Sequence, residues 1–230
     1  MDSIEQASPS YTATQIRIML AAEALFAENG IDGASLREIA VAAKQRNPFA
    51  AQYHFGSREE LIRAIFHYRM EQMEEPRGRM LLRAEREGRL HDPHAVMEMI
   101  YLPQVALVEK PENHGYATFL CQYLLRGHST IYGDFGIPLP PKLIRILSLL
   151  RQSVPQLSDA AAQRRLVSSS LVFLHFLSVY GGRRGLEAGG ETFEARLWDT
   201  LAQIEWATLM PITQGFPEGR LEATLDWIRD

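Results

Sequence analysis

Residues 45–52 bring together an arginine, an asparagine, two glutamines and a phenylalanine, all of which can contact nucleic-acid bases. Arg46 can donate to guanine O6 and N7, and the adjacent Asn47 can pair bidentately with adenine. Gln45 and Gln52 can either read bases or donate to phosphates. Phe49 is either an apolar contact to a thymine methyl or a packing residue. This combination predicts contact with DNA.

Two short helices joined by a tight turn would position these side chains. Ser35 and Glu38 have the spacing of a capping box, which predicts the start of the first helix. Its apolar face consists of Leu36, Ile39, Ala40 and Ala43. Asn47 and Pro48 form a second start signal, a side-chain cap followed by a residue suited to the first helical position. Asn47 could also serve only as this cap. Two helices so close in sequence predict a helix-turn-helix, whose second helix enters a major groove.

The charge distribution supports an interaction with phosphates. The segment 35–63 has five basic residues and three acidic ones, a net charge of +2 in a chain whose net charge is −4 at pH 7. The basic residues are Arg37, Lys44, Arg46, Arg58 and Arg63. A local positive patch can attract DNA even on an acidic protein.

Composition indicates a folded, soluble protein. Hydrophobic residues make up 46% of the chain, enough to bury a substantial core. The single cysteine, Cys121, excludes an internal disulfide and suits a reducing compartment. The first ten residues lack the features of a signal peptide, and no apolar run approaches the ~20 residues of a membrane span. We therefore expect a cytoplasmic protein that does not bind membranes.

Motifs of catalysis and cofactor binding are missing from the sequence. It has no nucleophile elbow, phosphate-binding loop, dinucleotide fingerprint or metal-ligand cluster. His54 has no second metal ligand at a supporting spacing. We expect a protein that is not an enzyme and that needs neither a cofactor nor a metal.

The remaining pattern predicts an all-α fold. Residues 1–10 are expected to form a flexible tail. A first helix should span residues 13–29 and end at Gly30. Ser57 and Glu60 should begin a long helix that ends at residues 73–75, because Pro76 disfavours helical geometry in the residue before it. Further helices are expected at 77–90 (exposed), 94–109, 113–128, 138–153, 159–181, 191–210 and 218–229, with loops at 129–141 and 181–190.

A set of residues in the N-terminal third resembles a known family signature. They are Ala22, Leu25, Phe26, Ala27, Gly30, Ser35, Leu36, Ile39, Ala40, Ala43, His54, Phe55, Ser57, Glu59, Glu60 and Leu61. In order and spacing they resemble the N-terminal signature of the tetracycline-repressor (TetR) family of bacterial regulators over residues 13–65. The resemblance implies a helix-turn-helix DNA-binding domain at 11–57 and an all-helical effector-binding and dimerisation domain at 58–230.

The sequence departs from the family pattern in two places. Lys44 stands where the family usually has glycine, and a lysine held there at positive φ would cost about 1 kcal/mol of strain. The interval from Ala43 to Phe55 is one residue longer than in most members, similar to a branch that carries comparable Gln-Arg-Asn and Gln-Tyr-His-Phe blocks.

The resemblance also implies roles for individual residues. In the family, the block around Tyr53 and His54 and the basic residue matched by Arg58 hold backbone phosphates. The predicted DNA-binding set is Ser35, Arg37, Lys44, Gln45, Arg46, Asn47, Phe49, Gln52, Tyr53, His54 and Arg58. Family members bind double-stranded DNA at palindromic operators as homodimers, which predicts a repressor released by an unknown small-molecule effector.

Two sites in the C-terminal two thirds are predicted less directly. Helices 159–181 and 191–210 could form a four-helix bundle between two subunits, or their apolar stripes could face the subunit's own core. The predicted dimer interface is Leu166, Ser170, Phe173, Leu177, Leu197, Leu201 and Ile204. The predicted ligand pocket is Met97, Tyr101, Phe119, Tyr123, His128, Phe173 and Phe176.

A different class of function is also compatible with helical periodicity. The chain could be a helical small-molecule carrier or an enzyme whose helix-turn-helix is only structural. Such a protein would bind its ligand normally after Arg46→Ala and would have no specific operator, whereas a regulator would lose specific DNA affinity.

Overall fold

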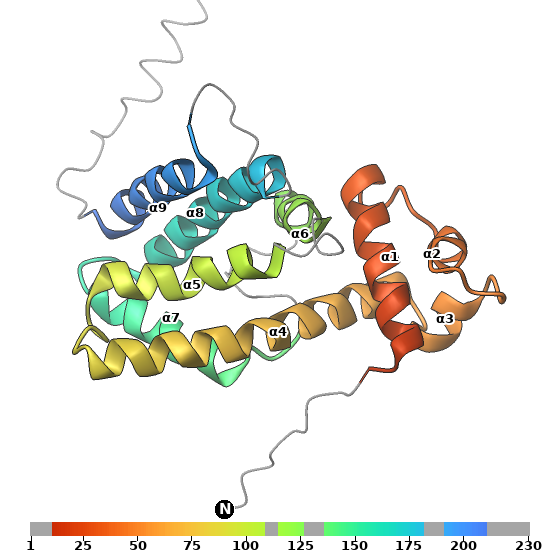
Figure 1. Ribbon diagram of the computed structural model, residues 1–230, viewed down its shortest axis with the longest axis horizontal. Coiled ribbons are helices and arrows are strands. Elements are labelled where there is room, and N and C mark those ends of the chain that lie inside the picture. The colour runs from red at the N-terminus through yellow and green to blue at the C-terminus, as the bar shows by residue number, and fades with distance from the viewer. Residues whose placement is uncertain (1–10, 109–114, 127–135, 182–190, 211–230) are drawn as a thin grey trace, which may run out of the picture.

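The described residues form an all-α protein, as predicted. The computed structural model describes residues 11–108, 115–126, 136–181 and 191–210. Within them lie the helices α1 (Ala13–Asn29), α2 (Leu36–Ala42), α3 (Ala50–Phe55), α4 (Arg58–Arg86), α5 (Pro93–Val108), α6 (Gly115–Leu125), α7 (Pro141–Ser153), α8 (Asp159–Tyr180) and α9 (Phe193–Leu209). Figure 1 shows α1–α3 grouped at one end of the molecule, α5 and α7–α9 at the other, and α4 running between the two groups.

Some predicted segments lie outside the described residues. They are the tail 1–10, the helix 218–229, and most of the loops 129–141 and 181–190. In the described part of the chain, no helix is both long and apolar enough to cross a membrane.

The N-terminal group, here called the head, is α1–α3. Helix α1 has the predicted bounds because both of its end signals are local: Thr12 and Gln15 form a capping box, and Gly30 follows its last residue with φ 80°. Ile18 and Phe26 of α1 are fully buried, and α1 packs against both α2 and α3. Small side chains on α2 and α3 let the three helices approach closely.

The turn after α2 is closed by two backbone hydrogen bonds. Lys44 has φ 54°, and its N–H donates to the Val41 carbonyl at 2.9 Å, while the Gln45 N–H donates to the Ala40 carbonyl at 3.0 Å. This pair of bonds is a Schellman motif, in which one residue must be left-handed. The strain predicted for Lys44 is therefore present.

Helix α3 begins two residues later than predicted. The Asn47 Oδ1 accepts from the Phe49 N–H at 2.9 Å, but Asn47 does not cap α3, whose N-cap is Phe49. The Ala50 N–H donates to the Asn47 carbonyl three residues back, at 3.1 Å. This tight turn occupies Pro48 and Phe49, so the first α-helical residue is Ala50.

The prediction that α4 ends before Pro76 is wrong, because the helix continues through this proline to Arg86. Proline removes one backbone hydrogen bond, but buried side chains on both sides of it hold the helix against α5 and α7. Met73 precedes the proline, and Arg77 and Leu81 follow it. Arg77 was predicted to lie on an exposed helix, yet it is only 1% exposed.

The head is attached to the rest of the molecule through α1, α4 and α6. Glu23 of α1 and Arg69 of α4 form a buried bidentate ion pair at 2.8 and 2.7 Å. Phe119 of α6 stacks on Phe26 of α1 and on Phe66 of α4, with ring centroids 5.8 and 5.2 Å apart. The head therefore shares one continuous hydrophobic core with the helical body, α4–α9.

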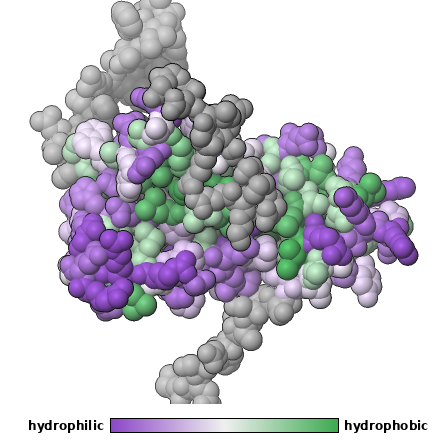
Figure 2. All heavy atoms as spheres, viewed as in Figure 1, coloured by the Kyte–Doolittle hydropathy of each residue, from purple (hydrophilic) through white to green (hydrophobic). Residues whose placement is uncertain are grey.

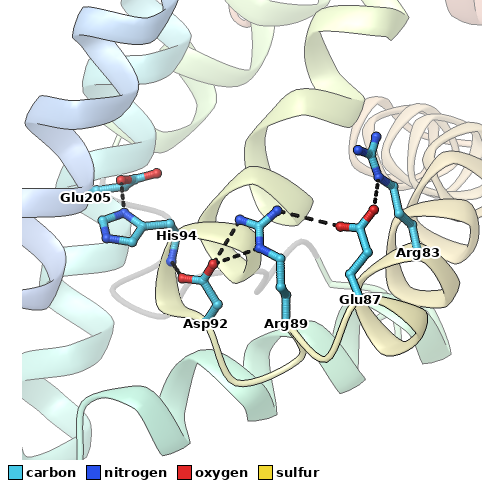
Figure 3. Close-up of polar contacts among 6 residues, drawn as sticks. All are labelled: Arg83, Glu87, Arg89, Asp92, His94 and Glu205. Carbon is cyan, nitrogen blue, oxygen red and sulfur yellow. Dashed lines mark hydrogen bonds and ion pairs between the residues drawn. The ribbon is translucent and has the colours of Figure 1, made fainter.

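At the far end of the body, a chain of charged side chains connects the end of α4 to α9 (Figure 3). Arg83 pairs with Glu87, and Arg89 contacts both Glu87 and Asp92. The next member is His94 of α5, whose Nδ1 lies 2.6 Å from the Glu205 Oε2 of α9. The hydrogen bond to this carboxylate raises the pKa of His94.

Candidate nucleic-acid interface

The predicted DNA-binding residues lie on α2, α3, the turns beside them and the first residue of α4, at the end of the molecule away from α8 and α9 (Figure 1). Eight of the eleven are exposed: Ser35, Arg37, Lys44, Arg46, Asn47, Phe49, Gln52 and Tyr53. The other three, Gln45, His54 and Arg58, are half-buried. Figure 2 shows hydrophilic side chains gathered at the outer tip of this end.

Three positive charges on this face are available to a ligand. Among the described residues, Arg37, Lys44 and Arg46 form no ion pair, whereas Arg58 and Arg63 at the start of α4 do. Unpaired cations on an exposed surface attract phosphates without first losing a partner.

Two aromatic side chains also point away from the core. Phe49 is 62% exposed and Tyr53 is 83% exposed. The structure thus decides against Phe49 as a packing residue. The Tyr53 ring contacts that of His54 edge-on, with centroids 5.2 Å apart, which places a hydroxyl and an imidazole side by side on the outer face of α3.

Asn47 can stabilise the turn before α3 and still read a base. Its hydrogen bond to the Phe49 N–H uses one lone pair of Oδ1, and an amide oxygen has two. The second lone pair and the amide nitrogen are what a bidentate contact to adenine requires. A structural role in this turn and a base contact are therefore compatible.

Arg58, which is predicted to contact a phosphate, has two partners within the protein. Its Nη2 donates to the Ala34 carbonyl at 2.9 Å, and its Nη1 lies 3.4 Å from the Asp32 carboxylate. The side chain fixes the start of α4 to the loop between α1 and α2, because both acceptors lie in that loop. Its two Nη atoms thus contribute to the fold.

Two other members of the set also have structural partners. The Gln45 amide donates to the Ala43 carbonyl at 2.8 Å and so helps to close the turn. Ser35 forms the predicted capping box with Glu38, and these hydrogen bonds lower the pKa of Glu38. Gln45 and Ser35 lie at the edge of the exposed face. Neither of these contacts excludes a role in DNA binding.

The described residues of the predicted ligand pocket fall into two groups. Tyr101 and Phe173 pack against each other between α5 and α8, with centroids 4.8 Å apart, and Phe176 continues this contact. Met97 is also fully buried. Phe119 and Tyr123 instead pack on Phe66 near the head. His128 lies outside the described residues.

The seven residues of the predicted dimer interface are buried within the single chain. Each is at most 7% exposed: Leu166, Ser170, Phe173, Leu177, Leu197, Leu201 and Ile204. The apolar stripes that these residues form hold α8 against α9, α6 and α5. The amphipathic pattern was real, but it faces the subunit's own core.

Sequence analysis missed the opposite faces of the same helices. A groove of about 860 Å³ runs between α8 and α9 and is lined by Arg164, Arg165, Ser168, Ser169, Val172, Ala202, Gln203, Ile204, Trp206 and Ala207. Trp206 is 67% exposed and Val172 is 48% exposed. The signal was a tryptophan off the apolar stripe of α9, a position where a residue buried within the subunit would not be expected.

A pair of short helices joined by a tight turn, with unpaired cations and aromatic side chains on its outer face, defines a helix-turn-helix DNA-binding protein. Residues 18–65 match the model of a family described as bacterial regulatory proteins, tetR family. The N-terminal segment of this chain is therefore similar to the DNA-binding domain of TetR-family regulators, which supports a DNA-binding regulator.

Comparisons over the whole chain add little to this assignment. No curated protein sequence matches the chain. A crystal structure from Rhodococcus sp., described as a TetR-family transcriptional regulator, aligns with 86% of this chain and 100% of its own at 17% identity and a TM-score of 0.39. This similarity is too low to define the function of the body.

Proposed function

We propose that this protein is a homodimeric transcriptional repressor that binds a palindromic operator and is released by a small-molecule ligand. The observation that carries the proposal is the exposed face of α2 and α3, with Arg37, Lys44 and Arg46 unpaired among the described residues. We divide the chain into a DNA-binding domain at 11–57 and a regulatory domain at 58–230. The protein would work in the cytoplasm, where bacterial DNA lies.

The contacts with DNA follow from the placement of these side chains. Arg46 and Asn47 precede α3 and would meet base edges, because residues at the N-terminal end of a recognition helix lie deepest in the groove. Lys44, Tyr53 and His54 would hold phosphates on either side. Phosphate contacts would fix the register, and base contacts would select the sequence.

A second copy of the chain is the partner that the groove between α8 and α9 supports. A monomer has one small head and few phosphate contacts, so it would bind DNA weakly. Trp206 and Val172 offer exposed apolar surface, and Ser168, Ala202 and Ala207 are small enough to let a helix approach closely. Pairing of α8 and α9 from two subunits would form a four-helix bundle and present two heads to a palindrome.

Release by a ligand requires that the body be coupled to the head. The buried Glu23–Arg69 pair and the stacked Phe26, Phe66 and Phe119 rings join α1, α4 and α6. A ligand that favours a different position of α4 or α6 would change the separation of the two heads and so weaken operator binding.

Selection of bound fragments from a random DNA pool tests the proposal. The selected site should be two-fold symmetric, and its affinity should fall steeply as salt rises. Arg46→Ala should weaken specific binding by about 1–3 kcal/mol, with the fold intact by circular dichroism. Arg79→Ala is the matched control, because Arg79 is an exposed arginine on α4 paired with Glu75. Indifference of the wild-type protein to every duplex would support the carrier alternative instead.

A further inference from the structure

A cavity of about 220 Å³ lies where the head meets the body, apart from the exposed face of α2 and α3 and from the groove between α8 and α9. It is lined by Ile31, Asp32, Arg58, Glu59, Ile62, Arg63, Tyr123, Arg126 and Gly136. Four parts of the chain meet here: the loop between α1 and α2, the first turns of α4, the end of α6, and Gly136 before α7. Whatever occupies this cavity touches head and body at once.

Three guanidinium groups line the cavity and are sheltered from solvent. The side chains of Arg58, Arg63 and Arg126 are 30%, 39% and 33% exposed. The Arg58 Nε is buried and has no hydrogen-bond partner among the described residues, and a buried donor without an acceptor is unfavourable. Arginine presents five N–H donors, so each of these side chains keeps donors beyond those used in its present pairs.

Carboxylates of the protein itself now occupy part of this donor set. Asp32, in the loop between α1 and α2, pairs with Arg58 and with Arg126. Glu60 pairs with Arg63. The Asp32 side chain is 67% exposed, so it can turn into water when a better-placed anion arrives. Arg126 would then exchange one carboxylate for another.

The rest of the lining is mostly apolar, apart from Glu59, an exposed carboxylate on the first turn of α4. Ile31 and Ile62 are 4% and 7% exposed, and the half-buried ring of Tyr123 lies beside them. A small ligand with an anionic head and a short apolar part would satisfy both kinds of wall, since carboxylates pair with the arginine fork and apolar groups gain from leaving water.

We propose that this cavity binds a small organic monocarboxylate, which displaces Asp32 from Arg126. The Asp32–Arg126 pair joins the head to the end of α6, so its exchange would loosen the head from the body. The proposal that an acid binds is argued only from the cavity. The proposed effect of acid binding on the DNA complex rests on the proposed function.

Calorimetric titration of the full-length protein tests the binding step. Butyrate and benzoate are compared with the neutral butyramide and benzamide at constant ionic strength. The acids should bind saturably and the amides should not. Arg126→Gln should weaken acid binding about tenfold or more, the effect of losing a charge-assisted hydrogen bond. Asp32→Asn should strengthen it, because the internal competitor is removed. The control Arg79→Gln should leave it unchanged.

Several outcomes would overturn the proposal: acids and amides binding equally, no saturable binding of either acid, or full affinity in Arg126→Gln. Binding of inorganic phosphate but of neither acid would overturn the ligand class. If Arg126→Gln does not fold by circular dichroism, Arg63→Gln replaces it, and unchanged acid affinity there counts equally against the site.

Gel shifts with a selected operator form a separate arm. The acids should weaken the complex of the wild-type protein more than that of Arg126→Gln at equal ionic strength. A protein that binds the acids but no operator would refute the proposed function and leave the site standing. A protein that binds its operator but no acid would refute the site and leave the proposed function standing.

Discussion

Lys44 shows at the scale of one residue how stability and DNA binding can oppose each other. It holds φ 54° because the Schellman turn after α2 needs a left-handed residue there, a conformation that glycine adopts without strain. The lysine also places an unpaired positive charge beside the start of the recognition helix. The turn geometry explains the strain, and the proposed phosphate contact explains why a strained lysine would be useful.

Lys44→Gly should therefore stabilise the protein and weaken its complex with DNA. Relief of strain should raise the free energy of unfolding by about 1 kcal/mol, or the melting temperature by roughly 2–4 °C. Loss of one phosphate contact should reduce the slope of log affinity against log salt by about 1. Thermal denaturation and salt-dependent gel shifts measure the two effects.

Lys44→Ala separates these contributions, because alanine keeps the strain of a left-handed residue and loses the charge. It should bind DNA as weakly as Lys44→Gly without the gain in stability. Equal DNA affinity in wild type and both variants would exclude a phosphate contact at this position.

At the scale of helices, a helix end was predicted correctly where capping residues within one turn determine it. It was predicted wrongly where tertiary packing determines it. The bounds of α1 were right because Thr12, Gln15 and Gly30 act within one turn of its ends. The end of α4 was wrong because the packing of Met73, Arg77 and Leu81 outweighs the preference of Pro76, and that packing involves helices distant in sequence.

The candidate sites also differ in whether residues close in the chain or distant in the chain build them. The exposed face of α2 and α3 was predictable, since the residues that build it lie close together in the chain. The apolar stripes of α8 and α9 were also predictable, but a stripe does not reveal whether a partner or the subunit's own core covers it. The cavity around Arg126 was not predictable, because it joins four segments whose meeting depends on the whole fold.

The buried pair Glu23–Arg69 makes the attachment of α1 to α4 sensitive to single changes. Arg69→Met should leave the Glu23 carboxylate buried without its cation and lower the free energy of unfolding by about 3–5 kcal/mol. The double variant Glu23→Leu, Arg69→Met should recover most of this loss, because an apolar pair needs no charge compensation. Urea denaturation measures both. A double variant no more stable than Arg69→Met would show that the pair itself supplies the stability.

The contact between His94 of α5 and Glu205 of α9 predicts a dependence of stability on pH (Figure 3). The Glu205 carboxylate raises the pKa of His94, aided by Asp92 and Glu98 nearby, while burial opposes the shift. Because the folded-state pKa is raised, the contribution is complete below the unfolded value of about 6.5 and is lost as pH rises through the higher folded value.

Melting temperatures of wild type and His94→Gln across this pH range test the contact. The difference between the two proteins should shrink as pH rises, and the effect should be small because the His94 side chain is 65% exposed. A difference that stays constant with pH would mean that the His94–Glu205 contact does not depend on the charge of the imidazole.

At the scale of the whole molecule, the head and the groove between α8 and α9 lie at opposite ends, connected by α4 and the shared core (Figure 1). If two subunits pair through this groove, the spacing of their heads is set by helices far from the DNA. Dimerisation and operator binding would then be linked, although no residue takes part in both.

Trp206→Glu tests this linkage, because a carboxylate at the centre of an apolar groove would oppose pairing of two subunits. Analytical ultracentrifugation should show a monomer. Affinity for a full palindromic operator should fall about 100-fold or more, since the second head no longer binds at high effective concentration, while affinity for a half-site should stay unchanged. Leu82→Glu is the matched control: Leu82 is 61% exposed on α4, outside the groove, so its variant should remain dimeric. A dimeric Trp206→Glu protein with full operator affinity would place the subunit interface elsewhere.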